Sequence, residues 1–225
     1  MFMTRHGRRS LLLPLAVWAL LLAPHAVEAG ERYYMVIFAS QSHPKIPRLS
    51  HTFGTIVRVT DAPPGCVNPC IEAYTISWLP QTMKVRPWRL HDEPGENFTL
   101  DATLRWAYAN HMDVTQWGPY EIDGDFFARV YREYARIQSG EFRYKAIDPR
   151  QRGARTTDCI HAISDIDRQH DRYEYSFVRS GDAVTYKLVR VLHERGRLFD
   201  PPCSLGWLEA ALGLDRYPII HGPNP

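Results

Sequence analysis

Residues 51–60 have the sequence HTFGTIVRVT, in which β-branched and aromatic residues follow a histidine. The earlier run RYYMVIFAS, at 32–40, has the same character, and a linker that contains prolines separates the two runs. A third run, IEAYTISWL at 71–79, follows a Pro-Pro-Gly loop. Runs of this composition, bounded by turn residues, are typical of β-strands. We therefore expect three strands that form a meander with a long second connection.

Helical spacing begins after these strands. Thr99 is a residue type that caps helices, and the residues after it recur at helical intervals. These apolar residues are Leu100, Leu104, Ala107 and Tyr108. A second helix is expected at about 122–138, where a wide apolar face ends at Ser139-Gly140.

The remaining segments have shorter patterns. A weak extended piece is predicted at 84–90 and a strand at 141–148. The runs 172–178 and 183–192 flank an Arg-Ser-Gly-Asp turn and predict a hairpin. A short helix is expected over 205–212. This order of elements predicts a single α+β domain, with an antiparallel sheet packed against helices.

The N-terminal segment predicts the compartment. In residues 1–29, three arginines precede an apolar run of about 14 residues, and small residues stand before Gly30. The run is shorter than the roughly 20 residues that span a bilayer. We expect a signal peptide at 1–29 and a mature domain at 30–225, secreted or held in the periplasm or cell envelope. An uncleaved N-terminal anchor is the alternative.

Charge and composition exclude several classes of partner. The chain has 27 Lys and Arg and 25 Asp and Glu, and residues 1–29 contain three Arg and one Glu, which leaves 24 of each sign in the mature domain. Nucleic-acid binding would need a basic face, so no nucleic-acid partner is expected. No transmembrane span is expected after signal removal, and no cofactor is predicted.

Four cysteines lie at positions 66, 70, 159 and 203. Cys66 and Cys70 bracket Val-Asn-Pro closely enough for a disulfide in an oxidising compartment. Zinc is the other interpretation of such a pair, but no second pair of ligands lies nearby at a suitable spacing, and no metal site is predicted.

The third cysteine lies in TTDCIHAISD, residues 156–165. Asp158 or Thr157 can cap a helix that begins near Cys159, and the positive end of that helix would favour a thiolate. Cys159 could instead pair with Cys203, or be a small buried residue. The sequence leaves these three interpretations open.

A cysteine nucleophile needs a histidine base, and His51 is the candidate because a strand end would hold its ring rigidly. His161 lies two residues after Cys159, where helical side chains do not face each other. The alternative for His51 is a structural histidine held by hydrogen bonds.

The order of a strand histidine, more strands and then a cysteine at a helix start resembles the circularly permuted papain-like group of cysteine amidohydrolases and acyltransferases. That group includes lecithin retinol acyltransferase-like proteins and permuted relatives of bacterial cell-wall endopeptidases. Its Asn-Cys-Glu-His-Phe motif is matched by Asp158-Cys159-Ile160-His161-Ala162, with the cysteine and the second following histidine retained. The resemblance covers about residues 32–167 and implies a permuted papain-like fold.

The resemblance also implies roles. Cys159 would be the nucleophile and His51 the base, and a polar residue on the next strand would orient the imidazole. Antiparallel pairing of 71–79 with 51–60 would bring its far end beside His51, where Ser77 is the polar candidate. Asp158 and Ile160 depart from the motif, and an anion beside the sulfur would raise the thiol pKa.

These features predict a secreted or envelope cysteine hydrolase. It would cleave a peptide-type amide or an ester through a thioester on Cys159, with a peptide-like or lipid-like envelope substrate. The alternative is a non-catalytic envelope binding domain on the same scaffold.

Overall fold

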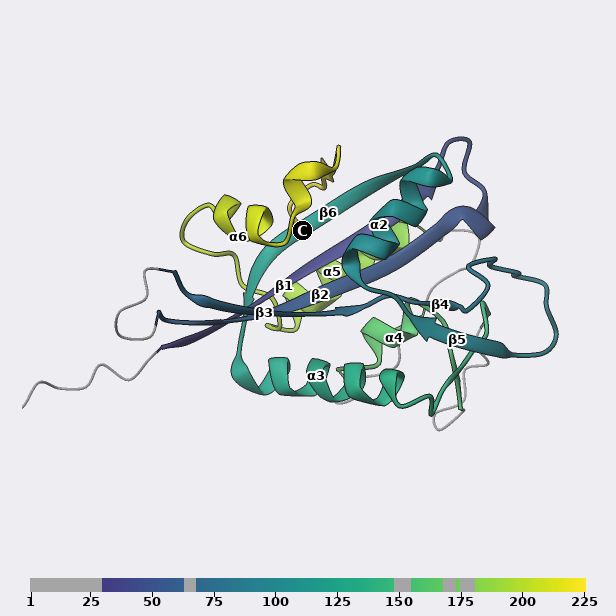
Figure 1. Cartoon of the computed structure of the whole chain (residues 1–225), viewed down its shortest axis with the longest axis horizontal. Helices are drawn as coiled ribbons and strands as arrows, with labels where there is room; N and C mark the ends of the chain where they lie inside the picture. Colours follow the sequence, from purple (N-terminus) through teal and green to yellow (C-terminus); the bar gives the residue numbers. More distant parts are fainter. Residues whose placement is uncertain (1–29, 63–67, 148–154, 168–172, 175–180) are drawn as a thin grey trace, which may run out of the picture. The chain divides into compact units, whose positions relative to one another are not determined.

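A five-stranded sheet organises the fold, with the strand order β3-β2-β1-β6-β9 (Figure 1). The strands β1 (Glu31–Ser42), β2 (Ser50–Thr60) and β3 (Cys70–Ile76) pair antiparallel in sequence, which confirms the predicted meander. β6 (Met112–Ile122) pairs antiparallel with the other edge of β1, and β9 (Ile220–His221) runs parallel to β6.

The computed structural model describes residues 30–62, 68–147, 155–167, 173–174 and 181–225. The predicted signal peptide at 1–29 therefore lies outside the described residues, as does Cys66. Residues 31–225 form one compact unit of mixed α and β structure, in agreement with the predicted α+β class.

A second, smaller sheet has the order β4-β5-β7-β8. Its strands are β4 (Trp78–Pro80), β5 (Glu93–Asn97), β7 (Arg143–Tyr144) and β8 (Thr156–Thr157). The strand predicted at 141–148 is thus only two residues long, and the extended piece predicted at 84–90 is wrong. That segment forms turns between β4 and β5, because Pro87 has no N–H for a ladder. This sheet connects the end of β3 to the Cys159 stretch.

Both predicted central helices are confirmed. α2 (Leu100–Ala109) is capped by Thr99, whose side chain accepts a hydrogen bond from the Ala102 N–H, and α3 (Gly124–Gln138) is capped in the same way by Asp123. Gly140, with a φ of 75°, follows the end of α3, where glycine adopts this left-handed conformation at low cost. The predicted stop at Ser139-Gly140 is therefore confirmed.

The predicted hairpin is wrong in its second arm, because Asp182–Glu194 forms the helix α5. Val184, Leu188 and Leu192 are buried at i, i+4 and i+8, so the apolar residues follow the helical period despite their β-branched neighbours. Most of the first arm lies outside the described residues. Shorter helices complete the chain: η1 (Pro47–Leu49), α4 (His161–Ser164), α6 (Gly206–Ala211) and η3 (Leu214–Arg216).

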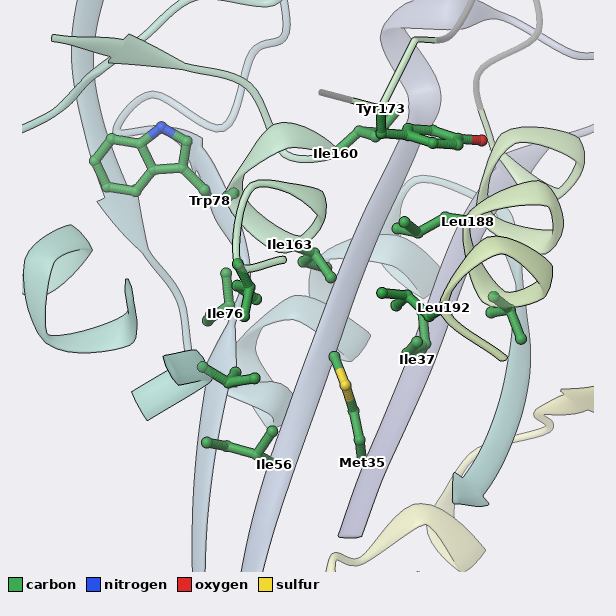
Figure 2. Close-up of a cluster of buried hydrophobic side chains, with 14 of the residues drawn as sticks. Met35, Ile37, Ile56, Ile76, Trp78, Ile160, Ile163, Tyr173, Leu188 and Leu192 are labelled. Atoms are coloured by element: carbon green, nitrogen blue, oxygen red, sulfur yellow. The ribbon is translucent and has the colours of Figure 1, made fainter. Parts of the chain in front are cut away.

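Helices cover both faces of the five-stranded sheet, since alternate residues of a strand point to opposite sides. On one face, Met35 and Ile37 belong to a buried cluster with residues of α4 and α5, and Figure 2 shows Ile163 and Leu188 in this layer. On the other face, α2 packs against the buried side chains Val36, Phe38 and Phe53. The described residues contain no helix that is long and apolar enough to cross a bilayer.

Candidate functional site

One edge of β2 is open where the candidate site lies. β3 ends at Ile76, which pairs with Gly54, so the earlier residues of β2 have no β3 partner. Ser77 follows directly, and Asn97 fixes it: the Ser77 N–H donates to Asn97 Oδ1 at 2.7 Å, and Asn97 Nδ2 donates to the Thr75 carbonyl at 2.8 Å. The side chain of Ser77 is thereby held beside the start of β2.

His51 and Ser77 are in direct contact. The His51 Nε2 atom and the Ser77 Oγ atom are 2.9 Å apart, and Ser77 Oγ also lies 2.7 Å from Thr103 Oγ1 of α2. The neighbourhood expected for Ser77 from strand pairing therefore agrees with the structure. Its role in catalysis stays a prediction.

The His51 ring is buried and uncharged at neutral pH. His51 is 1% exposed. The centroid of its ring lies 5.4 Å from the Phe53 ring centroid and 6.0 Å from the Trp106 ring centroid. This burial lowers the pKa of His51 to about 3. Its second nitrogen, Nδ1, is buried and makes no hydrogen bond with any described residue.

Cys159 lies at the open edge of β2, in the turn that precedes α4. The backbone N–H of Thr52, the residue directly after His51, acts on its sulfur and lowers the pKa of the thiol. The N–H groups of Cys159 and Ile160 also act on the sulfur. Three backbone donors from two elements thus converge where negative charge would develop on the sulfur or on an adjacent oxyanion.

The resting thiol is nevertheless protonated. Cys159 as a residue is partly exposed, but protein atoms surround its sulfur, and this burial raises the pKa of the thiol to about 12. The neighbouring Asp158 carboxylate raises the pKa further, while the backbone N–H groups lower it. The lowering of the thiol pKa that was expected from the helix start is therefore outweighed. The increase that was expected from the Asp158 carboxylate is present.

Asp158 caps the turn and holds a second histidine. Its Oδ1 atom accepts the N–H groups of Ile160 at 2.9 Å and His161 at 2.8 Å, so the cap predicted at Asp158 is present. Its Oδ2 atom lies 2.7 Å from His161 Nδ1, and His161 Nε2 lies 3.2 Å from the Tyr173 carbonyl oxygen. Both ring nitrogens of His161 thus face oxygen atoms that can accept hydrogen bonds.

The described cysteines are free. Cys70, Cys159 and Cys203 carry no disulfide, so the alternative in which Cys159 pairs with Cys203 is wrong. The partner predicted for Cys70, Cys66, lies outside the described residues. Within the described ranges, no three His, Cys, Asp or Glu side chains gather closely enough to hold a metal ion.

Two residues that position the site were not predicted. Asn97 and Thr103 act on Ser77 through contacts that depend on how β5 and α2 pack, and neither belongs to a local motif. A cavity of about 430 Å³ lies elsewhere, between Gly118-Pro119 of β6 and the C-terminal segment. None of Cys159, His51 and Ser77 lines it.

Comparisons with known proteins find no relative: no family model, no curated protein and no solved structure matches the chain. The papain-like resemblance therefore depends on the sequence motif alone.

Proposed function

We propose that the protein is a secreted or envelope cysteine hydrolase on a permuted papain-like scaffold, with Cys159 as the nucleophile and His51 as the base. One observation carries this proposal. The backbone N–H of Thr52 acts on the Cys159 sulfur, and the residue before Thr52 is a buried histidine whose Nε2 is held by Ser77 and whose Nδ1 is unused by any described residue.

The proposed reaction forms and breaks a thioester. The Cys159 sulfur attacks the carbonyl carbon of a peptide-type amide or an ester while His51 Nδ1 takes the thiol proton. Backbone N–H groups at the turn stabilise the oxyanion, the C–N or C–O bond breaks, and the leaving group takes the proton from His51. Water then attacks the thioester, which releases a carboxylic acid and restores the thiol.

Charge separation would occur only during this attack. Because Cys159 and His51 are both neutral at rest, the pair resembles a serine–histidine pair in its protonation more than a thiolate–imidazolium pair. The backbone donors at the sulfur support this step, since they are already in place before charge develops.

The same neutral pair favours a second candidate function. A thiol with a pKa of about 12 beside a histidine with a pKa of about 3 is poorly prepared to react. A non-catalytic envelope binding domain would retain such a pair as part of its core. The two candidates differ in whether an acyl group is ever found on Cys159.

Trapping of an acyl group tests the enzyme. The protein would be mixed with p-nitrophenyl acetate, and intact mass and peptide mapping would locate any acetyl group. We expect a burst of p-nitrophenol, acetylation at Cys159, and loss of both in Cys159→Ala and His51→Gln. Cys203→Ser, which removes an exposed free thiol, is the matched control and should behave like the wild type. Absence of an acetylated Cys159 would leave the binding domain as the better account.

The compartment has its own test. The N-terminal arginines and apolar run support export with cleavage before Gly30. The mass of the chain recovered from outside the cytoplasm of an expressing cell should correspond to residues 30–225. Recovery of the full-length chain only from the cytoplasm would contradict the secreted location. It would leave the proposed reaction at Cys159 unaffected.

A further inference from the structure

A gap interrupts the outer edge of β6, the edge that faces away from β1. On this edge, β9 pairs with residues 115–116, and Phe199 exchanges two backbone hydrogen bonds with Glu121. Between these contacts, residues 118–120 pair with no strand on this side within the described ranges. Pro119 has no N–H with which to continue a ladder. The cavity of about 430 Å³ lies at this gap.

Two carboxylates line this cavity, Asp200 before α6 and Glu209 within α6, and the described residues of the lining include no lysine and no arginine. One oxygen of each carboxylate faces a protein group. Glu209 Oε1 accepts a hydrogen bond from Gln116 Nε2, and Asp200 Oδ2 lies 3.7 Å from His193 Nε2. The second oxygen of each carboxylate makes no hydrogen bond with a described residue, so the cavity offers acceptors for a cationic group.

Gln116 orients one of these carboxylates. It is 2% exposed and lines the cavity, and its Nε2 atom donates to the Gly118 carbonyl oxygen at 3.2 Å as well as to Glu209. The buried amide is held by its own strand, so the Glu209 side chain loses part of its freedom before a ligand arrives. A charge that is ordered in advance binds its partner at a lower entropic cost.

Tyr120 adds a buried hydroxyl to the lining. The residue is 3% exposed, and its hydroxyl makes no hydrogen bond with any described residue. Burial and, after it, the nearby Asp200 carboxylate raise the pKa of Tyr120 to about 12, so the hydroxyl keeps its proton. Buried polar groups nearly always have a hydrogen-bond partner, and an unused one in a cavity wall is available to a polar ligand.

We propose that this cavity binds a small hydroxylated amine, such as an amino sugar. The ammonium group would bind to the carboxylates of Asp200 and Glu209 through charge-assisted hydrogen bonds. The hydroxyl groups would bind to Tyr120 and to the polar side chains of Ser204 and Asn224, which also line the cavity. Its volume lies within the range of roughly 300–1,000 Å³ that small-molecule sites have. The cavity contains no residue of the candidate catalytic site, so the inference does not depend on the proposed hydrolase.

Two exposed free cysteines report on occupancy of the cavity, since Cys203 lines it and Cys70 does not. The rate of alkylation by iodoacetamide would be measured at both by peptide mapping of the full chain at pH 7. D-glucosamine at about 10 mM, ten times a millimolar dissociation constant, should slow the reaction of Cys203 about tenfold and leave that of Cys70 unchanged. D-glucose and N-acetyl-D-glucosamine keep the sugar ring without an ammonium group, and they should protect Cys203 far less.

Glu209→Gln removes the charge and keeps an oxygen that can accept from Gln116. It should weaken binding of glucosamine about tenfold, as expected for one charge-assisted hydrogen bond. Glu194→Gln, which removes an exposed carboxylate of α5 outside the cavity, is the matched control and should bind glucosamine like the wild type. Three results would overturn the proposal: no protection of Cys203 by glucosamine, equal protection by glucose, or equal weakening in the two variants. The first two need no variant, so the test survives if Glu209→Gln does not fold.

Discussion

Opposite kinds of partner hold the two buried histidines His51 and His161. His51, on β2, contacts a neutral hydroxyl through Nε2 and lies among aromatic rings, so its imidazole stays uncharged. His161, on α4, contacts the Asp158 carboxylate through one nitrogen and a carbonyl oxygen through the other. The ring on the strand side is thus neutral, and the ring on the helix side lies between a carboxylate and a carbonyl oxygen.

The largest expected effect is a difference in stability between leucine substitutions at the two histidines. His161→Leu leaves the buried Asp158 carboxylate without the ring that faces it, which should cost about 4 kcal/mol of unfolding free energy. His51→Leu removes one hydrogen bond to Ser77, but the hydroxyl of Ser77 keeps its hydrogen bond with Thr103. This substitution should cost about 1 kcal/mol of unfolding free energy. Urea unfolding at pH 7 measures both. Equal losses would mean that the two rings have the same charge.

Low pH should destabilise the folded protein through the buried, neutral His51 ring. The unfolded chain protonates His51 near pH 6.5 and the folded chain only near pH 3, so the unfolded state binds more protons between these values. This contribution to stability is complete above pH 6.5 and is lost as the pH falls, by about 3 kcal/mol at pH 4.

His51→Gln isolates this contribution, because glutamine stays neutral throughout. The wild type should lose about 3 kcal/mol more than His51→Gln between pH 7 and pH 4 in urea unfolding. Parallel losses in the two proteins would show that the folded His51 accepts a proton as readily as a free imidazole.

The smallest expected effect concerns the charge beside the sulfur. After burial, Asp158 is the main cause that raises the pKa of Cys159, and Asp158→Asn removes its charge while an amide oxygen remains for the cap. The thiol pKa should fall by about one unit, and the rate of alkylation by iodoacetamide at pH 8 should rise about tenfold.

That alkylation experiment needs a background in which Cys66, Cys70 and Cys203 are serine, so that only Cys159 reacts. Asp158→Glu, which keeps the charge, is the matched control and should react at nearly the wild-type rate. A rate that does not change in Asp158→Asn would show that the His161 ring already cancels the effect of the carboxylate on the thiol.

Much of the sheet could be predicted because its signals are local. The β-branched runs at 32–40 and 51–60 and the capped helix after Thr99 carry their own periodicity. β6 was missed, since Gly118-Pro119 interrupts its pattern with a positive φ and a missing N–H, and the register with β1 shifts there. The β-branched residues of α5 suggested a strand, although their burial follows the helical period.

The residues of the candidate site also differ in how far the sequence predicted them. Ser77 could be placed beside His51 because strand pairing fixes neighbours from a register alone. Asn97 and Thr103 could not, because their contacts depend on how separate elements pack. The protonation of Cys159 also escaped prediction, since the sequence showed the helix start and Asp158 but not the depth of the sulfur.

The open edge of β2 has a consequence for the order of folding. His51 and Ser77 are 26 residues apart and meet through the meander, whereas Cys159 arrives from a much later part of the chain. Closing the longer loop costs more chain entropy, so we expect the sheet to form first and the thiol to dock last. Pulsed alkylation during refolding should then label Cys159 after β2 and β3 have already acquired protection from hydrogen exchange.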